Sequence, residues 1–553
     1  MTASRMRMPV VGLVALVLAA SMLWGVGVSR SASSSARVLL VGTWKGHAGQ
    51  YTTIQSAVDA ANPGDWILVA PGDYRESADS TYRPTSGSLR TGNYGSVLIT
   101  KAGLHLRGLN RNTVIVDGTK SGPNCSSAES DQNYGVVVDG QNAGRNGIVV
   151  YKANNVDISN LTTCNFLSGS GDSGNNIWWN GGAGSGGLGL TGYSGSYLNA
   201  TTTYYGGNAT AGTYGIFSSD AQGSKTTIWD NIYASNFNDS GMYVGACQRK
   251  CNITINHARM EYNALGYSGT NSGGSILIEN SLFQYNQDGL DTNTQIAGDP
   301  PPPQDGSCPA GEKPKIKGAH NCWILYKNTF QYNNQIVPTA GNAGAGPMGT
   351  GLTIAGGRND SLIGNTFKGN KAWGVLVIPF ADSDTPPAQW TCASSGGNMF
   401  SGLGCIYDSS NIEVVGNTFS QNGAFGNPTN GDIGQLVLFA GAQQSCYSGN
   451  VNKGVTGGKA TTFPTSLQTT NPTCTHALVS SRAGAKYPTT SLTSDIVSQV
   501  LCDTGFGACP TGNSYPGTGP LAMHPLPTSE LKSMPNPCLG VPSNAWCSKG
   551  KLI

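Results

Sequence analysis

The most regular pattern in the chain is a large apolar residue followed three positions later by Asn or Ser. Phe237, Met260 and Phe283 open three such units at intervals of 23 residues. Alternating apolar residues, such as Ile276 and Ile278, mark short half-buried strands. Later copies read NTFQYN, NTFKGN and NTFSQN and begin at Asn328, Asn365 and Asn417. A short unit of strands without helical periodicity predicts one coil of a β-helix, whose strands stack in parallel on the next coil.

The wider gaps between the later copies predict loops inserted at the corners of the coils. Residues 300–317 and 383–404 are rich in Pro, Gly and Cys and fit such loops. The recurring Asn has a structural interpretation, because stacked side-chain amides can bond to buried turn backbone and to one another.

The composition indicates a neutral, polar surface. Gly accounts for 78 of 553 residues, and charged residues are 11% of the chain, against roughly 25% in an average soluble protein. Lys and Arg total 32, Asp and Glu total 30, and the net charge is +2. Without a long basic run, a nucleic-acid-binding function is disfavoured, and acidic tails and coiled coils are equally unsupported.

The N-terminus and the cysteines indicate export. Arg5 and Arg7 precede the apolar run Pro9–Val28, which predicts a signal peptide over residues 1–36. The run is long for a signal peptide, so an uncleaved membrane anchor remains the alternative. The 14 cysteines are an even number and fit an oxidising compartment. We expect disulfides between the neighbours Cys247/Cys251, Cys308/Cys322, Cys392/Cys405, Cys502/Cys509 and Cys538/Cys547.

The segments Tyr51–Glu76 and Val97–Gly118 carry a resemblance to known proteins. They look like the opening of right-handed parallel β-helix proteins of the pectin-lyase-like superfamily. The string GMYVGACQRKC, Gly241–Cys251, further resembles secreted bacterial β-helix repeat proteins. The resemblance implies an amphipathic helix over Ile54–Ala61 that covers the first coil, where strand edges and core would otherwise be exposed.

The expected fold is therefore all-β, a right-handed parallel β-helix (solenoid) with an N-terminal helical cap and a disulfide-containing C-terminal extension. The extension, in which the repeat fades, is expected to wrap the last coil. The expected regions are a signal peptide at 1–36, the cap and first coils at 37–125, repeats at 126–454 with a Gly-rich insertion at 165–213, and the extension at 455–553.

Aromatic residues gather in the Gly-rich stretch 165–213, which is either a large loop or a set of irregular coils. Trp178, Trp179 and Tyr193 are the candidates for contacts with sugar rings. The alternative is that these rings pack the stretch against the flank of the β-helix.

Two carboxylates interrupt the repeat in the string YNQDGLDTNTQ. Asp288 and Asp291 lie three residues apart, with Gly289 between them. Across a turn at a coil corner they could converge on a hard cation such as calcium, or on a sugar. The alternative is that they bond to the turn backbone and stabilise it.

Two enzyme families share the expected fold. Polygalacturonases carry further carboxylate, His and basic motifs that this chain lacks. The string QDGLD more closely resembles the calcium-binding string of family-9 pectate lyases, and Gly349–Gly357 resembles the segment that carries their catalytic base. Here Gln287 replaces one calcium aspartate and Thr353 stands in place of the basic lysine. Arg358 and Lys327 are the remaining candidates for the base, with solvated side chains as the alternative interpretation.

Two functions remain open. The first is a secreted protein that acts on or binds extracellular acidic, uronate-containing polysaccharide, as a calcium-assisted lyase or epimerase if it is catalytic. The second is a non-catalytic cell-surface or matrix protein with a binding or structural role. In both cases we expect a monomer with no nucleic-acid partner.

Overall fold

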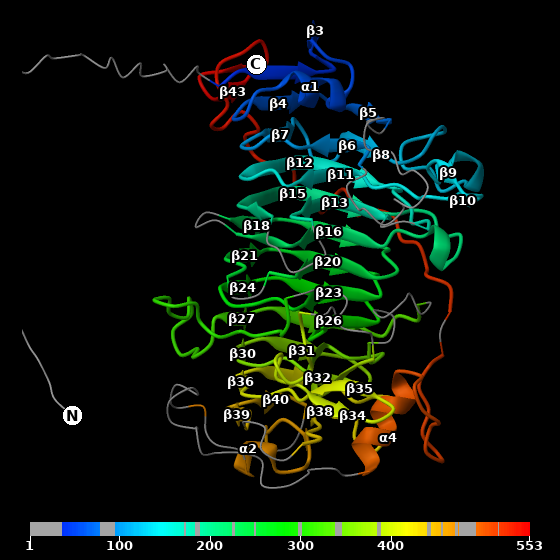
Figure 1. Cartoon of the computed structure of the whole chain (residues 1–553), viewed down its shortest axis with the longest axis vertical. Coiled ribbons are helices and arrows are strands. Elements are labelled where there is room, and N and C mark those ends of the chain that lie inside the picture. Colours follow the sequence, from blue (N-terminus) through cyan, green and yellow to red (C-terminus); the bar gives the residue numbers. More distant parts are fainter. Residues whose placement is uncertain are drawn as a thin grey trace, which may run out of the picture. The chain divides into compact units, whose positions relative to one another are not determined.

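Parallel strands stack from coil to coil in two long sheets (Figure 1). The computed structural model describes residues 36–553 apart from 78–94, 171–172, 183–188, 224–226, 248–249, 297–300, 338–345, 384–388, 440–443, 455–456, 471–473, 475–493 and 518. Apart from Ala36, the predicted signal peptide lies outside the described residues. Within these ranges, no helix combines the length and the apolar composition that a membrane span requires.

The 11-stranded sheet contributes one face to each coil. Its strands, in spatial order, are β6 (Val97–Ile99), β11 (Ile148–Tyr151), β13 (Asn175–Asn180), β16 (Tyr214–Ser219), β20 (Ser240–Gly245), β23 (Leu265–Thr270), β26 (Asp288–Asn293), β29 (Leu352–Ala355), β32 (Trp373–Ile378), β38 (Gly431–Gln435) and β41 (Thr462–Phe463). Every neighbouring pair is parallel, as the repeat predicted.

The 21-stranded sheet contains two ladders that merge in the long strands β12 (Val156–Cys164) and β15 (Tyr193–Thr201). The first ladder also contains β1 (Val38–Val41), β4 (Trp66–Val69), β7 (His105–Gly108), β18 (Ile228–Asp230), β21 (Ile253–Asn256), β24 (Ile276–Glu279), β27 (Trp323–Tyr326), β30 (Asp360–Ile363), β36 (Glu413–Val415) and β39 (Cys446–Ser448). The second also contains β5 (Gly72–Tyr74), β8 (Val114–Asp117), β19 (Tyr233–Ser235), β22 (Arg259–Glu261), β25 (Leu282–Gln284), β28 (Thr329–Gln331), β31 (Thr366–Lys368), β37 (Thr418–Ser420) and β40 (Val451–Asn452). The coils are thus those of a parallel β-helix.

Short strands and helices lie outside the two long sheets. The additional strands are β2 (Thr43–Trp44), β3 (His47–Ala48), β9 (Val137–Val138), β10 (Gln141–Asn142), β14 (Leu190–Thr191), β17 (Ala221–Gln222), β33 (Phe380–Asp382), β34 (Asn398–Phe400), β35 (Gly404–Tyr407), β42 (Cys547–Ser548) and β43 (Lys551–Leu552). The helices are α1 (Ile54–Ala60), α2 (Leu467–Thr470), α4 (Ser494–Asp503) and the 3-10 turns η2 (Glu129–Asp131) and η3 (Asn208–Thr210).

The repeat residues form continuous columns inside the β-helix. Phe283, Phe330, Phe367 and Phe419 stack with ring centroids 4.8, 5.1 and 5.0 Å apart. This spacing follows the distance of about 4.8 Å between neighbouring strands. The core therefore extends along the stack as one cluster of buried apolar side chains.

The recurring Asn residues form hydrogen-bonded ladders, as the sequence predicted. The backbone N–H and the Nδ2 group of Asn286 both donate to Oδ1 of Asn333, at 3.1 and 3.0 Å. Asn333 makes the same pair of bonds to Asn370, each at 3.1 Å. Asn333 Nδ2 also donates to the carbonyl of Phe283 at 3.2 Å. These buried amides join the corners of successive coils.

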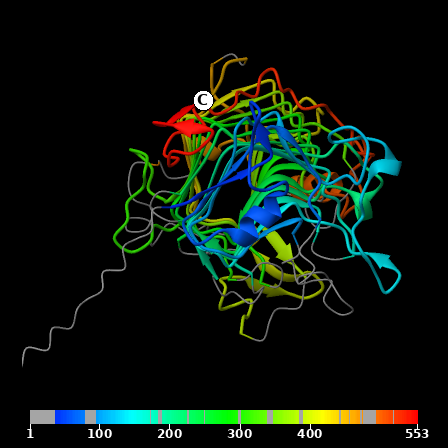
Figure 2. The ribbon, with the colours of Figure 1, turned by 90° about the horizontal axis from the view of Figure 1, so that it is seen from above.

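Helix α1 covers the first coil, and the expected helical cap is confirmed (Figure 2). The Thr53 side chain accepts a hydrogen bond from Ser56 N and caps the first turn. Ile54, Ala57 and Val58 are buried against the core. The helix ends at Ala60, one residue earlier than predicted.

All five expected disulfides are present. Two more, Cys125–Cys164 and Cys446–Cys474, join residues 39 and 28 positions apart in the chain, which neighbour pairing did not predict. Seven disulfides suggest an extracellular location.

The C-terminal extension does not simply wrap the last coil. Helix α4 packs near the lower coils, but residues 519–553, the C-terminal strap, run back along the stack to the first coil (Figure 1). The strap bonds in turn to Asn236 through His524, to Asn160 through Met534, to Arg107 through Leu539 and to Trp44 through Ile553. Successively later strap residues thus bond to successively earlier coils.

Candidate functional site

The predicted aspartate pair lies on the 11-stranded sheet. Asp288 is the first residue of β26 and Asp291 the fourth, so the pair belongs to a strand and not to a corner. Asp288 is fully buried. Its carboxylate accepts hydrogen bonds from Leu290 N at 3.1 Å and from Thr353 Oγ1 at 2.7 Å. One oxygen of Asp291 is buried without a hydrogen-bond partner among the described residues.

Both carboxyls have raised pKa values. Burial raises the pKa of Asp288 well above its usual range, and the neighbouring charge of Asp291 adds to the rise, which Thr353 and Leu290 partly oppose. Burial also raises the pKa of Asp291, to about 8. The burial that raises these pKa values disfavours the charged carboxylates, and a protonated carboxyl is a poor ligand for a cation.

The sequence left calcium binding open as one of two roles for Asp288 and Asp291, the other being hydrogen bonds to the turn backbone. Both Asp288 oxygens already accept hydrogen bonds from the protein. Calcium takes six to eight oxygen ligands. Among the described residues, the only group of three close acidic, His or Cys ligands is Asp117 with Cys125 and Cys164. The present arrangement around Asp288 therefore does not fit a calcium centre.

The two candidate bases lie away from the aspartate pair. Arg358 follows the C-terminal end of β29, whereas Asp288 pairs with Thr350, which precedes the start of that strand. The guanidinium of Arg358 forms an ion pair with Asp305, with 3.0 Å between Nε and Oδ2. Lys327 is an exposed corner residue after β27, in the other sheet, with its ammonium group over the Tyr326 ring. Thr353 lies beside Asp291 on the neighbouring strand, and its hydroxyl donates a hydrogen bond to Asp288. Neither side chain forms an ion pair with Asp288 or Asp291 among the described residues, and the role of Arg358 and Lys327 as bases stays a prediction.

The candidate sugar-binding aromatics are buried in strands. Trp179 on β13 and Tyr193 on β15 are 0% and 2% exposed and belong to the main core. Trp178, which points to the opposite face of β13, is 6% exposed and stacks on Phe217 with centroids 5.0 Å apart. The described parts of 165–213 are thus irregular coils rather than one loop, and these three rings offer no exposed face to a sugar.

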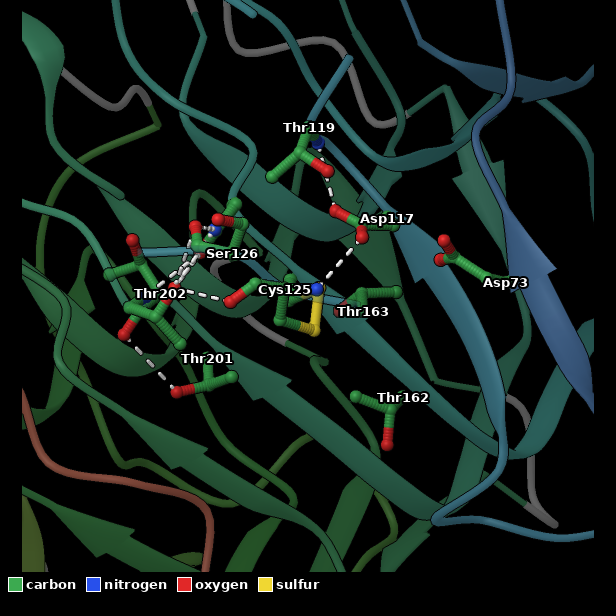
Figure 3. Close-up of a disulfide and its surroundings, with 12 residues drawn as sticks. Asp73, Asp117, Thr119, Cys125, Ser126, Thr162, Thr163, Thr201 and Thr202 are labelled. Carbon is green, nitrogen blue, oxygen red and sulfur yellow. Dashed lines mark hydrogen bonds between the residues drawn. A yellow bond between two sulfur atoms is a disulfide. The ribbon is translucent and has the colours of Figure 1, made fainter. Parts of the chain in front are cut away.

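The group formed by Asp117, Cys125 and Cys164 is a structural junction (Figure 3). Its two sulfurs form a disulfide and are not available to a metal. Asp117 accepts hydrogen bonds from the backbone N–H groups of Thr119 and Cys125, each at 2.8 Å. Burial and the charge of Asp117 raise the pKa of Asp73 to about 6, although Arg75 opposes the rise. The junction attaches the loop that carries Cys125 to the coils.

An open groove runs between a column of tyrosines and the C-terminal strap. This tyrosine groove has a volume of about 950 Å³ and is lined by Tyr262, Tyr285, Tyr332, Asn334, Gln335, Ile336, Gly517, Gly519, Pro520, Ala522 and His524. The three tyrosine rings are stacked, with centroids 5.3 and 6.0 Å apart. His524 of the strap stacks on Tyr262 at 3.6 Å. The column thus presents ring edges and hydroxyls, and Tyr285 is 37% exposed.

A second groove continues the same column of corners toward the later coils. This lysine groove, of about 450 Å³, is lined by Thr366, Lys368, Thr418, Ser420, Gln421, Lys453 and Gly454. The Lys368 ammonium lies 5.4 Å from the Tyr332 ring centroid and joins the two grooves. Neither Lys368 nor Lys453 forms an ion pair with a described carboxylate.

Comparison with known proteins gives matches among solved structures alone. No family model matches the chain, and no curated protein matches it. Two mannuronan C-5 epimerase A-modules from Azotobacter vinelandii do match. AlgE6 is 14% identical over 72% of this chain and 88% of its own, with a TM-score of 0.40. AlgE4 is 12% identical over 72% and 90%, with a TM-score of 0.38.

The matches among solved structures also include a pectate lyase. Pectate lyase Pel9A is 13% identical over 89% of this chain and 96% of its own, with a TM-score of 0.34. At these scores the matches carry no argument about activity. The parallel β-helix architecture rests on the strand register of the chain itself.

The sequence contained a signal for the tyrosine groove. Tyr262, Tyr285 and Tyr332 each directly precede a ladder Asn, in the strings EYN, QYN and QYN. Once the Asn is placed at a corner, the preceding residue must lie at the same corner in every coil. The strap, more than 180 residues further along the chain, supplies the other wall of the groove, and no local pattern indicates that contact.

Proposed function

We propose that the protein is a secreted, right-handed parallel β-helix protein that binds an extracellular acidic polysaccharide without transforming it. The observation that carries this proposal is the continuity of the tyrosine groove with the lysine groove along one column of coil corners. The predicted N-terminal signal peptide provides the export route.

The chemistry of the two grooves supports an acidic polysaccharide as the ligand. The tyrosine hydroxyls can exchange hydrogen bonds with sugar hydroxyls, and the exposed ring edges can contact sugar C–H groups. The ammonium groups of Lys368 and Lys453, which form no ion pair with a described carboxylate, attract the carboxylates of a ligand. Thr366, Thr418 and Ser420 add hydroxyl groups between the lysines. A uronate polymer offers both kinds of group along a single chain.

The aspartate pair supports binding rather than lyase or epimerase action. A lyase needs a basic side chain to remove the proton beside the uronate carboxylate. Asp288 is fully buried and receives a hydrogen bond from Thr353, a residue that cannot serve as that base. Neither Arg358 nor Lys327 contacts the pair. Calcium therefore has no role in the proposed function.

Titration calorimetry with polygalacturonate, alginate and a neutral glucan tests the proposal. The double variant Lys368→Gln/Lys453→Gln is expected to weaken binding to the acidic polymers about tenfold at low salt, since exposed charge pairs each contribute up to about 1 kcal/mol. Tyr285→Ala is expected to weaken binding about fivefold, from the loss of one aromatic contact.

Matched controls lie outside the grooves. Lys313→Gln and Phe506→Ala change an exposed lysine and an aromatic residue that is 74% exposed, and both should leave the affinity unchanged. Unaltered affinity in the two groove variants, or the release of unsaturated uronate products by the wild-type protein, would contradict the proposal.

A further inference from the structure

A column of side chains along the second ladder carries the two lysines of the lysine groove. Lys368, on β31, pairs in register with Ser420, on β37. On the third coil Asn452 pairs with Phe419, so Lys453, the next residue, occupies the position that corresponds to Ser420. The column therefore reads lysine, serine, lysine over three successive coils.

Positive charge thus recurs at alternate coils of this column. Neighbouring strands of a sheet lie about 4.8 Å apart, so the backbone positions of Lys368 and Lys453 are separated by about 10 Å along the stack. The coil between them contributes only the hydroxyl of Ser420. On the coil before Lys368 the column continues with Gln331, which donates through Nε2 to Gln284 Oε1 at 2.6 Å. The spacing of the two charges is therefore set by the register of the coils.

The corner beside this column leads from the tyrosine groove to the lysines. Because Gln331 pairs with Lys368, Gly369 corresponds on its coil to Tyr332 on the preceding one. Gly369 has a φ of +65°, and a methyl group at this position would lie 2.5 Å from the Tyr332 ring. The Lys368 ammonium lies 5.4 Å from the centroid of the same ring. No side chain separates the last tyrosine from the first lysine, so one extended ligand can contact both.

An extended polysaccharide that follows this column advances by close to one sugar per coil, because the length of a sugar residue in such a chain is close to the spacing of the strands. In a chain with twofold twist, neighbouring sugars face opposite sides. A uronate homopolymer of this shape presents every second carboxylate to the protein. A strict alternation of uronate and uncharged sugar presents carboxylates to the same side at the same interval.

We propose that the lysine groove selects acidic polysaccharides that present a carboxylate to the protein at every second sugar, with the polymer axis along the stack of coils. Lys368 and Lys453 each bind one carboxylate, and Ser420 bonds to hydroxyls of the sugar between them. The sugars beyond Lys368 contact the ring edges of Tyr332 and Tyr285. This inference rests on the proposed function, because it defines the charge spacing of the same ligand.

Competition by short oligosaccharides for the wild-type protein tests the spacing, with fluorescently labelled alginate and polygalacturonate as the bound polymers. Two trisaccharides of alternating hexuronate and N-acetylhexosamine are compared, one with uronates at both ends and one with a single central uronate. The first should compete about fivefold more strongly at low salt, because it reaches both lysines and gains one further exposed charge pair.

A trimer of mannuronate distinguishes the two kinds of polymer. It carries carboxylates on its first and third sugars, as the first trisaccharide does. If it competes as strongly as that trisaccharide, the ligand class includes twofold homopolymers. If only the alternating trisaccharide competes, the class is that of the alternating copolymers. Both results support the proposed spacing.

An exchange of two residues changes the spacing and keeps the net charge. In Ser420→Lys/Lys453→Gln the second lysine moves to the coil next to Lys368, so the two ends of the first trisaccharide no longer reach a lysine together. This variant should lose the fivefold preference between the two trisaccharides. Ser401→Lys/Lys120→Gln makes the same exchange at exposed positions outside the grooves and should keep the preference.

The wild-type comparison does not depend on the folding of any variant. Equal competition by the two trisaccharides would overturn the inference, as would a preference that persists in Ser420→Lys/Lys453→Gln. In both cases binding of the labelled polymers would leave the proposed function standing. Failure of the wild-type protein to bind either labelled polymer would instead overturn the proposed function and this inference together.

Discussion

Replacement of Asn333 by Ala tests the Asn ladder most directly, because this residue donates and accepts at the centre of the ladder. Its Oδ1 accepts from Asn286 N and Nδ2, while its Nδ2 donates to the Phe283 carbonyl and to Asn370 Oδ1. Asn333 is 0% exposed, so water cannot replace these bonds.

The magnitude follows from the groups left without partners. In Asn333→Ala, two donors of Asn286 and the carbonyl of Phe283 lose their partner inside the protein. An unsatisfied buried polar group costs about 1–3 kcal/mol, and these costs are not fully additive. We expect the free energy of unfolding to fall by about 3–6 kcal/mol. Asn333→Asp keeps an acceptor for Asn286 and loses the donor only when its carboxyl is ionised. It should therefore be the milder change at acidic pH, where the protonated carboxyl can still donate.

Equilibrium unfolding in urea with intact disulfides measures both variants. Asn398→Ala, at an exposed Asn, serves as the control and should change stability by no more than about 0.5 kcal/mol. A cost below about 1 kcal/mol for Asn333→Ala would refute the reasoning, because it would mean that the buried donors find other partners. If Asn333→Ala is not secreted, Asn333→Asp at acidic and neutral pH provides the same test.

Two further predictions concern burial and the strap. Trp179→Ala should lower the free energy of unfolding by about 3–5 kcal/mol through the cavity it leaves, and the folded fraction should bind polysaccharide as the wild type does in calorimetry. Cys538→Ser/Cys547→Ser should lower stability by about 2–3 kcal/mol and reduce hydrogen-exchange protection of β1 and β4, whose residues Leu40 and Leu68 pack in one cluster with Cys538 and Cys547. Unchanged protection of those strands would show that the strap does not stabilise the first coil.

The coils could be predicted because their signals are local and repeated. An apolar residue three positions before an Asn defined the corner in copy after copy, and the Phe stack and the Asn ladders follow from that spacing. The five neighbouring disulfides were also within reach of local patterns, whereas the cap at Ile54 was implied by the family resemblance. Cys125–Cys164 was not, because its cysteines meet through a loop whose path depends on Asp117 and its contacts.

The candidate site was less predictable because function depends on which face a residue occupies. In a strand, a shift of one position reverses the face, and Trp178 and Trp179 accordingly enter two different buried clusters. Arg358 and Lys327 lie on a coil near Asp288, but Lys327 is at a corner after β27 in the other sheet and Arg358 follows the end of β29.

The path of the C-terminal strap affects how the protein folds. In an ordinary repeat protein each unit contacts only its neighbours, so folding can begin at one end and spread. Here Trp44 Nε1 bonds to the carbonyl of Ile553, and Trp546 donates to the carbonyl of His47. The first coil is thus completed by residues that lie 499 and 509 positions further along the chain. Removal of the contacts made by Trp546 and Ile553 should therefore loosen the opposite end of the stack. Through the strap, distant coils unfold more cooperatively than contacts between neighbouring coils alone would allow.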